Sequence, residues 1–134
     1  MRIIITLLSI LTSSMCAADV VHWRGFEIHY TTFNSTLIPS DVARAHDIVR
    51  SKHRIITNIT VRRDGMPVRA TLTGTTRNLL SQLVTLDFAE VSEAGAVYYL
   101  ANLVVDERDM LIFKINIKPE NHTDEFHLEF TRKY

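Results

Sequence analysis

Six histidines are the side chains of this sequence best suited to hold a metal ion: His22, His29, His46, His53, His122 and His127. Imidazole nitrogens and carboxylate oxygens together bind zinc and copper. Glu125, His127 and Glu129 alternate along one segment and offer such a mixed set. However, no two histidines have the short spacing that is typical of ligands on one element. We therefore interpret them as surface histidines and predict no metal site and no cofactor.

Nucleophilic side chains form no catalytic pattern in this sequence. The G-x-S-x-G motif is absent, and the serines after residue 18 lie in turn or cap contexts. The only cysteine is Cys16, close to the N-terminus. Tyr98 and Tyr99 would point to opposite sides of one strand, which is typical of core packing. We predict no catalytic residue and favour a non-enzymatic protein.

Basic side chains gather in one part of the chain and could bind an anionic partner. Between Arg44 and Arg77, eight basic residues stand against two acidic ones, whereas Asn78 to Glu129 has ten acidic and three basic residues. A basic surface would attract an anionic partner. The residues that we predict to form this partner-binding surface are Arg50, Lys52, Arg54, Arg62, Arg63 and Arg69. The alternative is that these charges pair with the acidic half of the chain, as ordinary surface charges do.

Alternating apolar residues predict strands that position these side chains. About seven such segments follow one another with turn signals between them. Leu111 to Ile117 and Phe126 to Phe130 are two of the clearest. Such a pattern predicts an all-β protein, an immunoglobulin-like antiparallel β-sandwich. A small closed barrel is the alternative.

Local signals add detail to this sandwich. Asp64-Gly65 predicts a type I′ turn in a long hairpin from Arg54 to Arg77, in which Ile59 would face Ala70. Val20 to Phe33 reads as a single strand with a bulge at Gly25. Pro39-Ser40-Asp41 predicts the start of one short helix after this strand, with Ser40 as its N-cap. The inward face of this helix would carry Val42, Ala45 and Val49.

The first eighteen residues have the features of a secretory signal peptide. A basic Arg2 precedes the apolar run Ile3 to Leu11, and Cys16-Ala17-Ala18 ends in small residues. We predict a signal peptide at 1–18 and one domain at 19–134; a lipoprotein attached through Cys16 fits the motif less well. No later segment is apolar for the roughly 20 residues that cross a bilayer. The neutral net charge argues against nucleic acid as a partner.

Several segments resemble the domain of unknown function 4426, a family of small secreted Gram-negative bacterial proteins. The resemblance lies in Phe26 to Ser35, Val42 to Arg54, Gly74, Asn78-Leu79-Leu80 with Gln82, and Phe88 to Leu100. It implies a periplasmic protein with an immunoglobulin-like domain. It implies no activity and no ligand residues.

Three functions are therefore compatible with the sequence. We favour a non-enzymatic interaction module that binds an envelope protein or an anionic envelope component, through the basic residues, the helix or a free sheet edge. The first alternative is a small-ligand binder or hydrolytic enzyme whose site assembles in space under the helix. The second is a chaperone-like strand acceptor, which requires an uncovered apolar edge strand.

Overall fold

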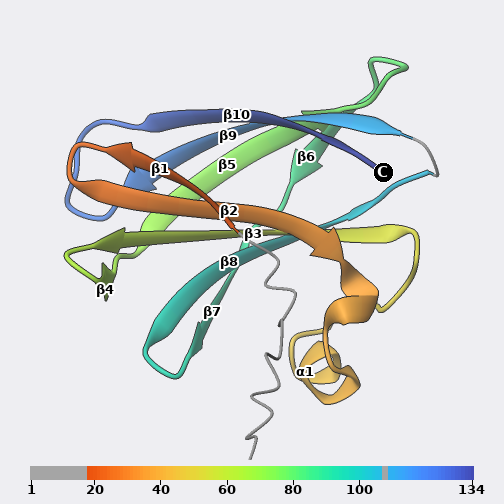
Figure 1. The fold of residues 1–134 in the computed structure, drawn as a ribbon, viewed down its shortest axis with the longest axis horizontal. Helices are drawn as coiled ribbons and strands as arrows, with labels where there is room; N and C mark the ends of the chain where they lie inside the picture. The colour runs from red at the N-terminus through yellow and green to blue at the C-terminus, as the bar shows by residue number, and fades with distance from the viewer. Residues whose placement is uncertain (1–17, 107–108) are drawn as a thin grey trace, which may run out of the picture.

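The computed structural model describes residues 18–106 and 109–134, and these form two antiparallel sheets packed face to face (Figure 1). Sheet A has the order β1 (Asp19–Trp23), β2 (Phe26–Asn34), β3 (Arg54–Arg63), β8 (Ala96–Val104) and β7 (Ala89–Glu93), with β4 (Met66–Pro67) also paired to β3. Sheet B has the order β10 (Phe126–Lys133), β9 (Met110–Pro119), β5 (Ala70–Arg77) and β6 (Leu83–Leu86). The predicted all-β sandwich is confirmed, with ten strands in the described residues where about seven were expected.

The core lies between the inner faces of the two sheets. Sheet A contributes buried residues such as Ile28, Ile59 and Val61, and sheet B contributes Phe113 and Ile115. On β9 every second residue is buried, so the alternation seen in the sequence does mark the inward face. Burying one such side chain contributes about 1.5–3 kcal/mol, and this apolar layer holds the two sheets together.

The expected bulge at Gly25 is wrong, because the chain makes a hairpin turn there. Trp23 ends β1 and lies opposite Phe26 at the start of β2. Arg24 and Gly25 both have positive φ, 49° and 79°, as the two central residues of a type I′ turn require. The turn brings Trp23 and Phe26 to the same inner face. This explains why the inward apolar residues have odd numbers before Gly25 and even numbers after it.

The predicted long hairpin is also wrong beyond its first two residue pairs. Asp64 and Gly65 form the expected turn with φ of 51° and 75°, and Arg62 lies opposite Pro67. After Val68 the chain leaves sheet A and continues as β5 in sheet B. Ile59 pairs with strands β2 and β8 on its two sides, so β3 has no vacant edge there for the rest of the second arm.

The α-helix α1 (Ser40–Ala45), the only one in the described residues, lies on the outer face of sheet A, after a 3-10 turn η1 (Ser35–Leu37). Its N-cap is Pro39, so the helix includes Ser40, which was expected as the cap. The predicted inward face is wrong for Ala45 and Val49, which are exposed. Ala43 is buried instead, because it packs with Ile56 of sheet A. The helix therefore covers one end of the sheet and leaves the open side of the sandwich uncovered.

Candidate interaction site

The open side of the sandwich is where the chain crosses from sheet B to sheet A, between β6 and β7. Strand β5 pairs with β9 over Ala70–Arg77 but with β6 only over Gly74–Arg77. Within the described part of the chain, the segment 70–73 thus has a paired strand on one side only. We call these four residues the free edge. A free edge presents backbone groups that can pair with another chain.

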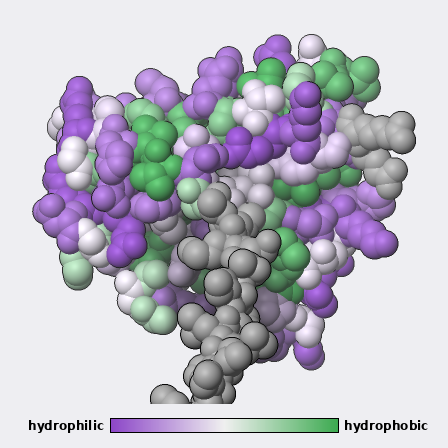
Figure 2. Space-filling view, in the orientation of Figure 1, coloured by the Kyte–Doolittle hydropathy of each residue, from purple (hydrophilic) through white to green (hydrophobic). Residues whose placement is uncertain are grey.

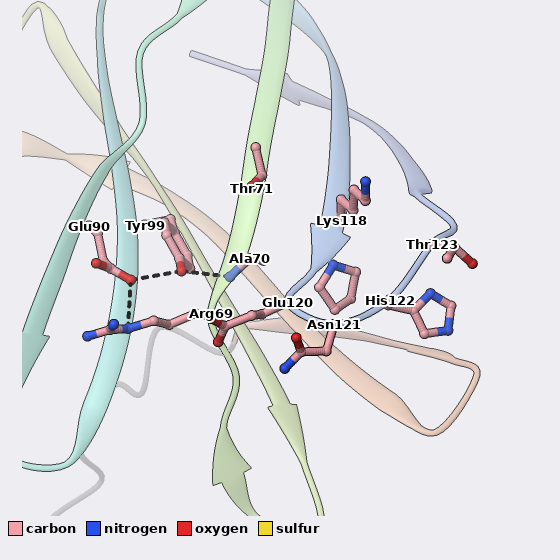
Figure 3. A pocket seen from close by; sticks show the side chains of 11 residues that line it. Arg69, Ala70, Thr71, Glu90, Tyr99, Lys118, Glu120, Asn121, His122 and Thr123 are labelled. Atoms are coloured by element: carbon pink, nitrogen blue, oxygen red, sulfur yellow. Dashed lines mark hydrogen bonds and ion pairs between the residues drawn. The ribbon is translucent and has the colours of Figure 1, made fainter.

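A tyrosine from the opposite sheet reaches this free edge. Tyr99 of β8 accepts a hydrogen bond from the backbone N–H of Ala70 at 2.8 Å and donates one to Glu90 of β7 at 3.0 Å. Arg69 completes the network, with its Nε 3.4 Å from the same Glu90 oxygen (Figure 3). The network links the two sheets through polar groups, and it satisfies a backbone donor that would otherwise face solvent.

A hollow of about 630 Å³ surrounds this network. Its lining joins the free edge to the loop after β9, and the side chains lie around the hollow as Figure 3 shows. The polar residues among them are Arg69, Thr71, Glu90, Tyr99, Lys118, Glu120, Asn121, His122 and Thr123. A site under the helix was one expectation, but the lining residues come from β7 and β8 of sheet A, from sheet B and from the loop after β9, and none of them comes from α1.

Burial raises the pKa of the Tyr99 phenol above its ordinary value of 10.0; the Ala70 N–H lowers this pKa, and the hydrogen bond to Glu90 raises it again. Burial likewise raises the pKa of Tyr134. A raised folded-state pKa means that the folded protein favours the protonated phenol. The stabilisation that each protonated phenol contributes is therefore complete below pH 10, and it is lost as pH rises through the folded-state pKa of that phenol.

We predict that the free energy of unfolding falls as pH rises above 10 and that Tyr99→Phe makes this fall smaller. The measurement is urea unfolding of both proteins at pH values below and above 10. Adding Tyr134→Phe should reduce the fall further. An identical pH dependence in the wild type and the double variant would contradict the prediction.

A second surface beside the free edge is apolar. The turn between β5 and β6 and the strand β6 expose Leu79, Leu80, Leu83 and Val84, with 62%, 79%, 59% and 45% of their surfaces accessible. We call these four residues the leucine edge. Figure 2 shows hydrophobic surface at the upper right, where Figure 1 places this turn. Exposed apolar residues that lie together are typical of interaction surfaces.

Hydrogen bonds hold the turn of the leucine edge in one shape. The Asn78 side-chain oxygen accepts from the backbone N–H groups of Leu80 at 3.0 Å and Gln82 at 2.9 Å. The Asn78 N–H donates to the Gln82 carbonyl at 3.2 Å, and Ser81 has a φ of 59°. Such local bonds are typical of an Asx-type turn. The two leucines are therefore presented to solvent by an ordered loop.

The six predicted partner-binding residues do not form one surface. Arg50, Lys52 and Arg54 lie at or before the start of β3, whereas Arg62 and Arg63 lie at its end. Strand geometry, at about 3.3 Å per residue, separates these ends by about 30 Å. Arg69 lies beside the hollow, two residues after Pro67, which pairs with Arg62.

Five of these six side chains already contact other groups of the protein. The guanidinium groups of Arg50, Arg62 and Arg63 donate to the backbone carbonyls of Thr36, Gly65 and Arg24. Arg54 donates to the Asn102 side chain, Arg69 contacts Glu90, and Arg63 also lies 4.0 Å above the Phe26 ring. At Arg69 the charge pairs with the acidic half of the chain, as the alternative interpretation expected.

Comparisons with known proteins agree with this fold. The family model described as "Domain of unknown function (DUF4426)" matches residues 21–134. The chain belongs to this family. A crystal structure of a DUF4426 family protein from Pseudomonas aeruginosa is 30% identical, covers 88% of this chain and 94% of that chain, and has a TM-score of 0.81. The resemblance inferred from the sequence is thus confirmed. No curated protein matches the sequence.

The fold of this DUF4426 chain is shared with more distant proteins. FetP of uropathogenic Escherichia coli, expressed in the periplasm, has a TM-score of 0.64 at 11% identity, covering 88% of this chain and 93% of that chain. A copper-bound FetP variant has a TM-score of 0.63 at 13% identity, covering 88% of this chain and 95% of that chain. At these identities the likeness concerns the fold.

Four of the six histidines of the DUF4426 chain contact neighbouring side chains. In residues 18–106 and 109–134, no group of three or more His, Cys, Asp or Glu side chains could hold a metal ion. His127 contacts the Asn116 side chain, and His122 packs edge-on against Trp23 at 5.2 Å between ring centres. His46 and His29 each contact one glutamate, Glu93 and Glu27, at 3.2 Å.

Other sequence predictions for this family member lie partly outside the structure. The predicted signal peptide, with Cys16, falls in residues 1–17 apart from Ala18, outside the described residues. No described helix is long and apolar enough to span a membrane.

Sequence reasoning missed the hollow, because only the fold brings Glu90 of β7 and Tyr99 of β8 next to Arg69, which precedes β5. The uncharged sequence Leu83 to Leu86 was the signal that could have indicated the leucine edge.

Proposed function

We propose that this DUF4426 protein is a non-enzymatic interaction module of the periplasm, which binds another envelope protein through the leucine edge. The observation that carries the proposal is the composition of the outermost strands. Three of the four carry charged residues: Asp19 on β1, Glu90 and Glu93 on β7, and Glu129 and Lys133 on β10. Strand β6, with the sequence LVTL, carries none.

Charged residues on an edge strand oppose pairing with other chains. Their absence from β6, together with the exposed leucines beside it, is what a protein-binding edge requires. The exposed apolar edge at β6 also supports the strand-acceptor hypothesis, which requires such an edge. A docked strand would pair with the backbone of β6 while Leu79 and Leu80 contact its side chains. Covering the leucine edge removes its apolar surface from water, which favours binding.

The leucine edge is favoured over the basic residues because the arginines have partners within the protein. A basic surface made of Arg50, Arg54, Arg62, Arg63 and Arg69 would have to give up the contacts described above. Periplasmic location is part of the proposal. It is supported by the predicted signal peptide and by the likeness to FetP, which was expressed in the periplasm.

The test is crosslinking of the tagged protein in the bacterial periplasm, followed by mass spectrometry, with two matched variants. Leu83→Lys places a charge on the outer face of β6, where 59% of the residue is exposed. Val20→Lys places the same charge on β1, which already carries Asp19. Val20 is 43% exposed.

We expect Leu83→Lys to reduce the yield of the reproducible crosslinked partner by about tenfold, the equivalent of about 1.4 kcal/mol, while Val20→Lys leaves it unchanged. Circular dichroism checks that both variants fold. Equal yields from the two variants would overturn the leucine edge as the binding surface.

A further inference from the structure

Strand β6 is the last strand of sheet B, and among the described residues it pairs only with β5 (Figure 1). We propose that the leucine edge joins two copies of this chain, with β6 of one copy antiparallel to β6 of the other across a two-fold axis at Val84. This inference rests on the proposed function of the leucine edge as a protein-binding surface, and it names the partner. It follows from the backbone groups, the side chains and the flanking charges of β6.

One hydrogen bond shows which backbone groups of β6 are free. The N–H of Asn78 donates to the Gln82 carbonyl at 3.2 Å, so Gln82 directs its backbone groups toward β5. Because these groups alternate along a strand with a period of two, Val84 also faces β5, whereas Leu83 and Thr85 face away from it. The N–H and carbonyl groups of Leu83 and Thr85 therefore point to the open side of sheet B.

A second copy of β6 supplies the matching groups. When the two strands run antiparallel about an axis at Val84, Leu83 of each copy lies opposite Thr85 of the other. Each of these pairs exchanges both of its hydrogen bonds, and the two valines form the closer, non-hydrogen-bonded pair between them. A shift of one residue would set inner-face side chains opposite outer-face ones, and a shift of two would pair Leu83 or Thr85 but not both. The axis at Val84 thus satisfies all the free backbone groups of β6.

The side chains that meet in this register are apolar. Val84 lies opposite the buried Thr76 of β5, so it belongs to the inner face of sheet B, yet 45% of its surface is exposed. The two-fold covers this valine with its own copy. The other exposed large apolar residues outside the leucine edge, within the described ranges, lie on separate elements: Val20 on β1, Leu37 on η1, Val49 after α1, Met66 on β4 and Val104 on β8. The surface of this chain that best matches a leucine edge is therefore another leucine edge.

Opposite charges flank β6 at its two ends. Arg77 of β5 pairs with Leu83 at the start of β6, and Asp87 follows Leu86 at its end. Both charged residues are exposed, and neither is in an ion pair with another described residue. Antiparallel pairing brings the Asp87 end of each β6 beside the Arg77 end of the other copy, while the uncharged strand places no like charges across the axis. This pattern is complementary to itself, which selects a second copy of the chain in a closed, two-fold contact.

The first test is sedimentation velocity of the protein purified from the bacterial periplasm, at about 1 to 100 µM. Val84→Lys places a positive charge opposite itself at the axis, and Val84→Glu places a negative one. We expect the wild type to form dimers and each variant alone to associate at least about tenfold more weakly, because like charges meet. An equimolar mixture of the two variants should recover the dimer, since only an axis at Val84 sets residue 84 against its own copy. Circular dichroism checks that both variants fold.

A cysteine at the axis gives a second measurement. In a non-hydrogen-bonded pair the Cα atoms lie about 4.5 Å apart, within the range of about 4.4–6.8 Å that a disulfide requires. We expect Val84→Cys to form a disulfide-linked dimer under mild oxidation. Val20→Cys is the matched control, because Val20 lies on the edge strand β1 and is 43% exposed. Both variants keep Cys16, the only cysteine of the sequence, so a difference between them belongs to the new thiol.

A wild-type protein that stays monomeric over this concentration range overturns the proposal. So does a mixture of Val84→Lys and Val84→Glu that associates no better than either variant alone, or an equal yield of disulfide-linked dimer from Val84→Cys and Val20→Cys. These failures differ from a failure of the proposed function. A monomeric protein whose crosslinking in the periplasm still depends on Leu83 would keep the leucine edge as a binding surface, with a different protein as its partner.

Discussion

Replacing Phe113 by alanine is expected to lower the free energy of unfolding by about 3–5 kcal/mol. Phe113 is fully buried on β9. Its ring stacks on Phe130 of β10 at 4.6 Å between centres, and Phe130 in turn lies 4.8 Å from the ring of Tyr30 in sheet A. The three rings join the two sheets. Removing the first ring leaves a cavity that the surrounding β-structure can close only in part.

Urea unfolding followed by circular dichroism measures this loss. Phe126→Ala is the matched control, because Phe126 is a half-buried residue on β10 that packs against Trp23 at the rim of the core. Its loss should be clearly smaller, since water can occupy the vacated space. A Phe113→Ala protein as stable as Phe126→Ala would show that the stacked rings do not hold the sheets together.

The inner faces of the strands could be predicted from the sequence because burial imposes a period of two. Phe113 and Ile115 were assigned to one face by alternation alone, and both are buried. The identity of neighbouring strands could not be predicted in this way. Ala70 has the right parity to face Ile59 in a hairpin, but it has an equally suitable position beside Pro119 of β9. Alternation does not distinguish the two, and only the fold decides between them.

Turn signals were informative where they matched the preferred residues. Asp64-Gly65 is a common type I′ pair and was recognised. Arg24-Gly25 makes the same turn but has arginine in the first position, which is unfavourable at positive φ. The packing of Trp23 near Phe26, with ring centres 6.1 Å apart, compensates for the unfavourable φ of Arg24.

The candidate site was the least predictable part. Of the hollow's residues, the sequence patterns indicated Arg69 only as part of a basic surface and His122 only as a surface histidine. The pairing of Arg69 with Glu90 depends on where β7 lies relative to β5, which is a long-range property of the sandwich. Tyr99 was interpreted as a core residue, and its ring is buried. No residue pattern indicates that its hydroxyl group reaches the Ala70 backbone.

Gly74 lies where the free edge ends and the pairing with β6 begins, in close contact with β9. A Cβ atom on Gly74 would lie 3.0 Å from the Lys114 carbonyl oxygen and 3.0 Å from the Ile115 side chain. The first contact is with backbone, which cannot rotate away. Gly74→Val is therefore expected to lower the free energy of unfolding by about 3 kcal/mol, at the upper end of what overpacking costs.

Thr75→Val is the matched control, because it places the same side chain on the next residue of β5. Thr75 is half-buried and lines a hollow over the outer face of sheet B, beside Lys114 and Asn116. This change of one hydroxyl group for a methyl group should therefore cost less than about 1 kcal/mol. Urea unfolding compares the two variants. Equal stabilities would contradict the steric argument. If Gly74→Val instead moves β5 away from β9, the amides of β6 should exchange faster than those of β3, because β6 pairs only with β5 whereas β3 is held by strands on both sides.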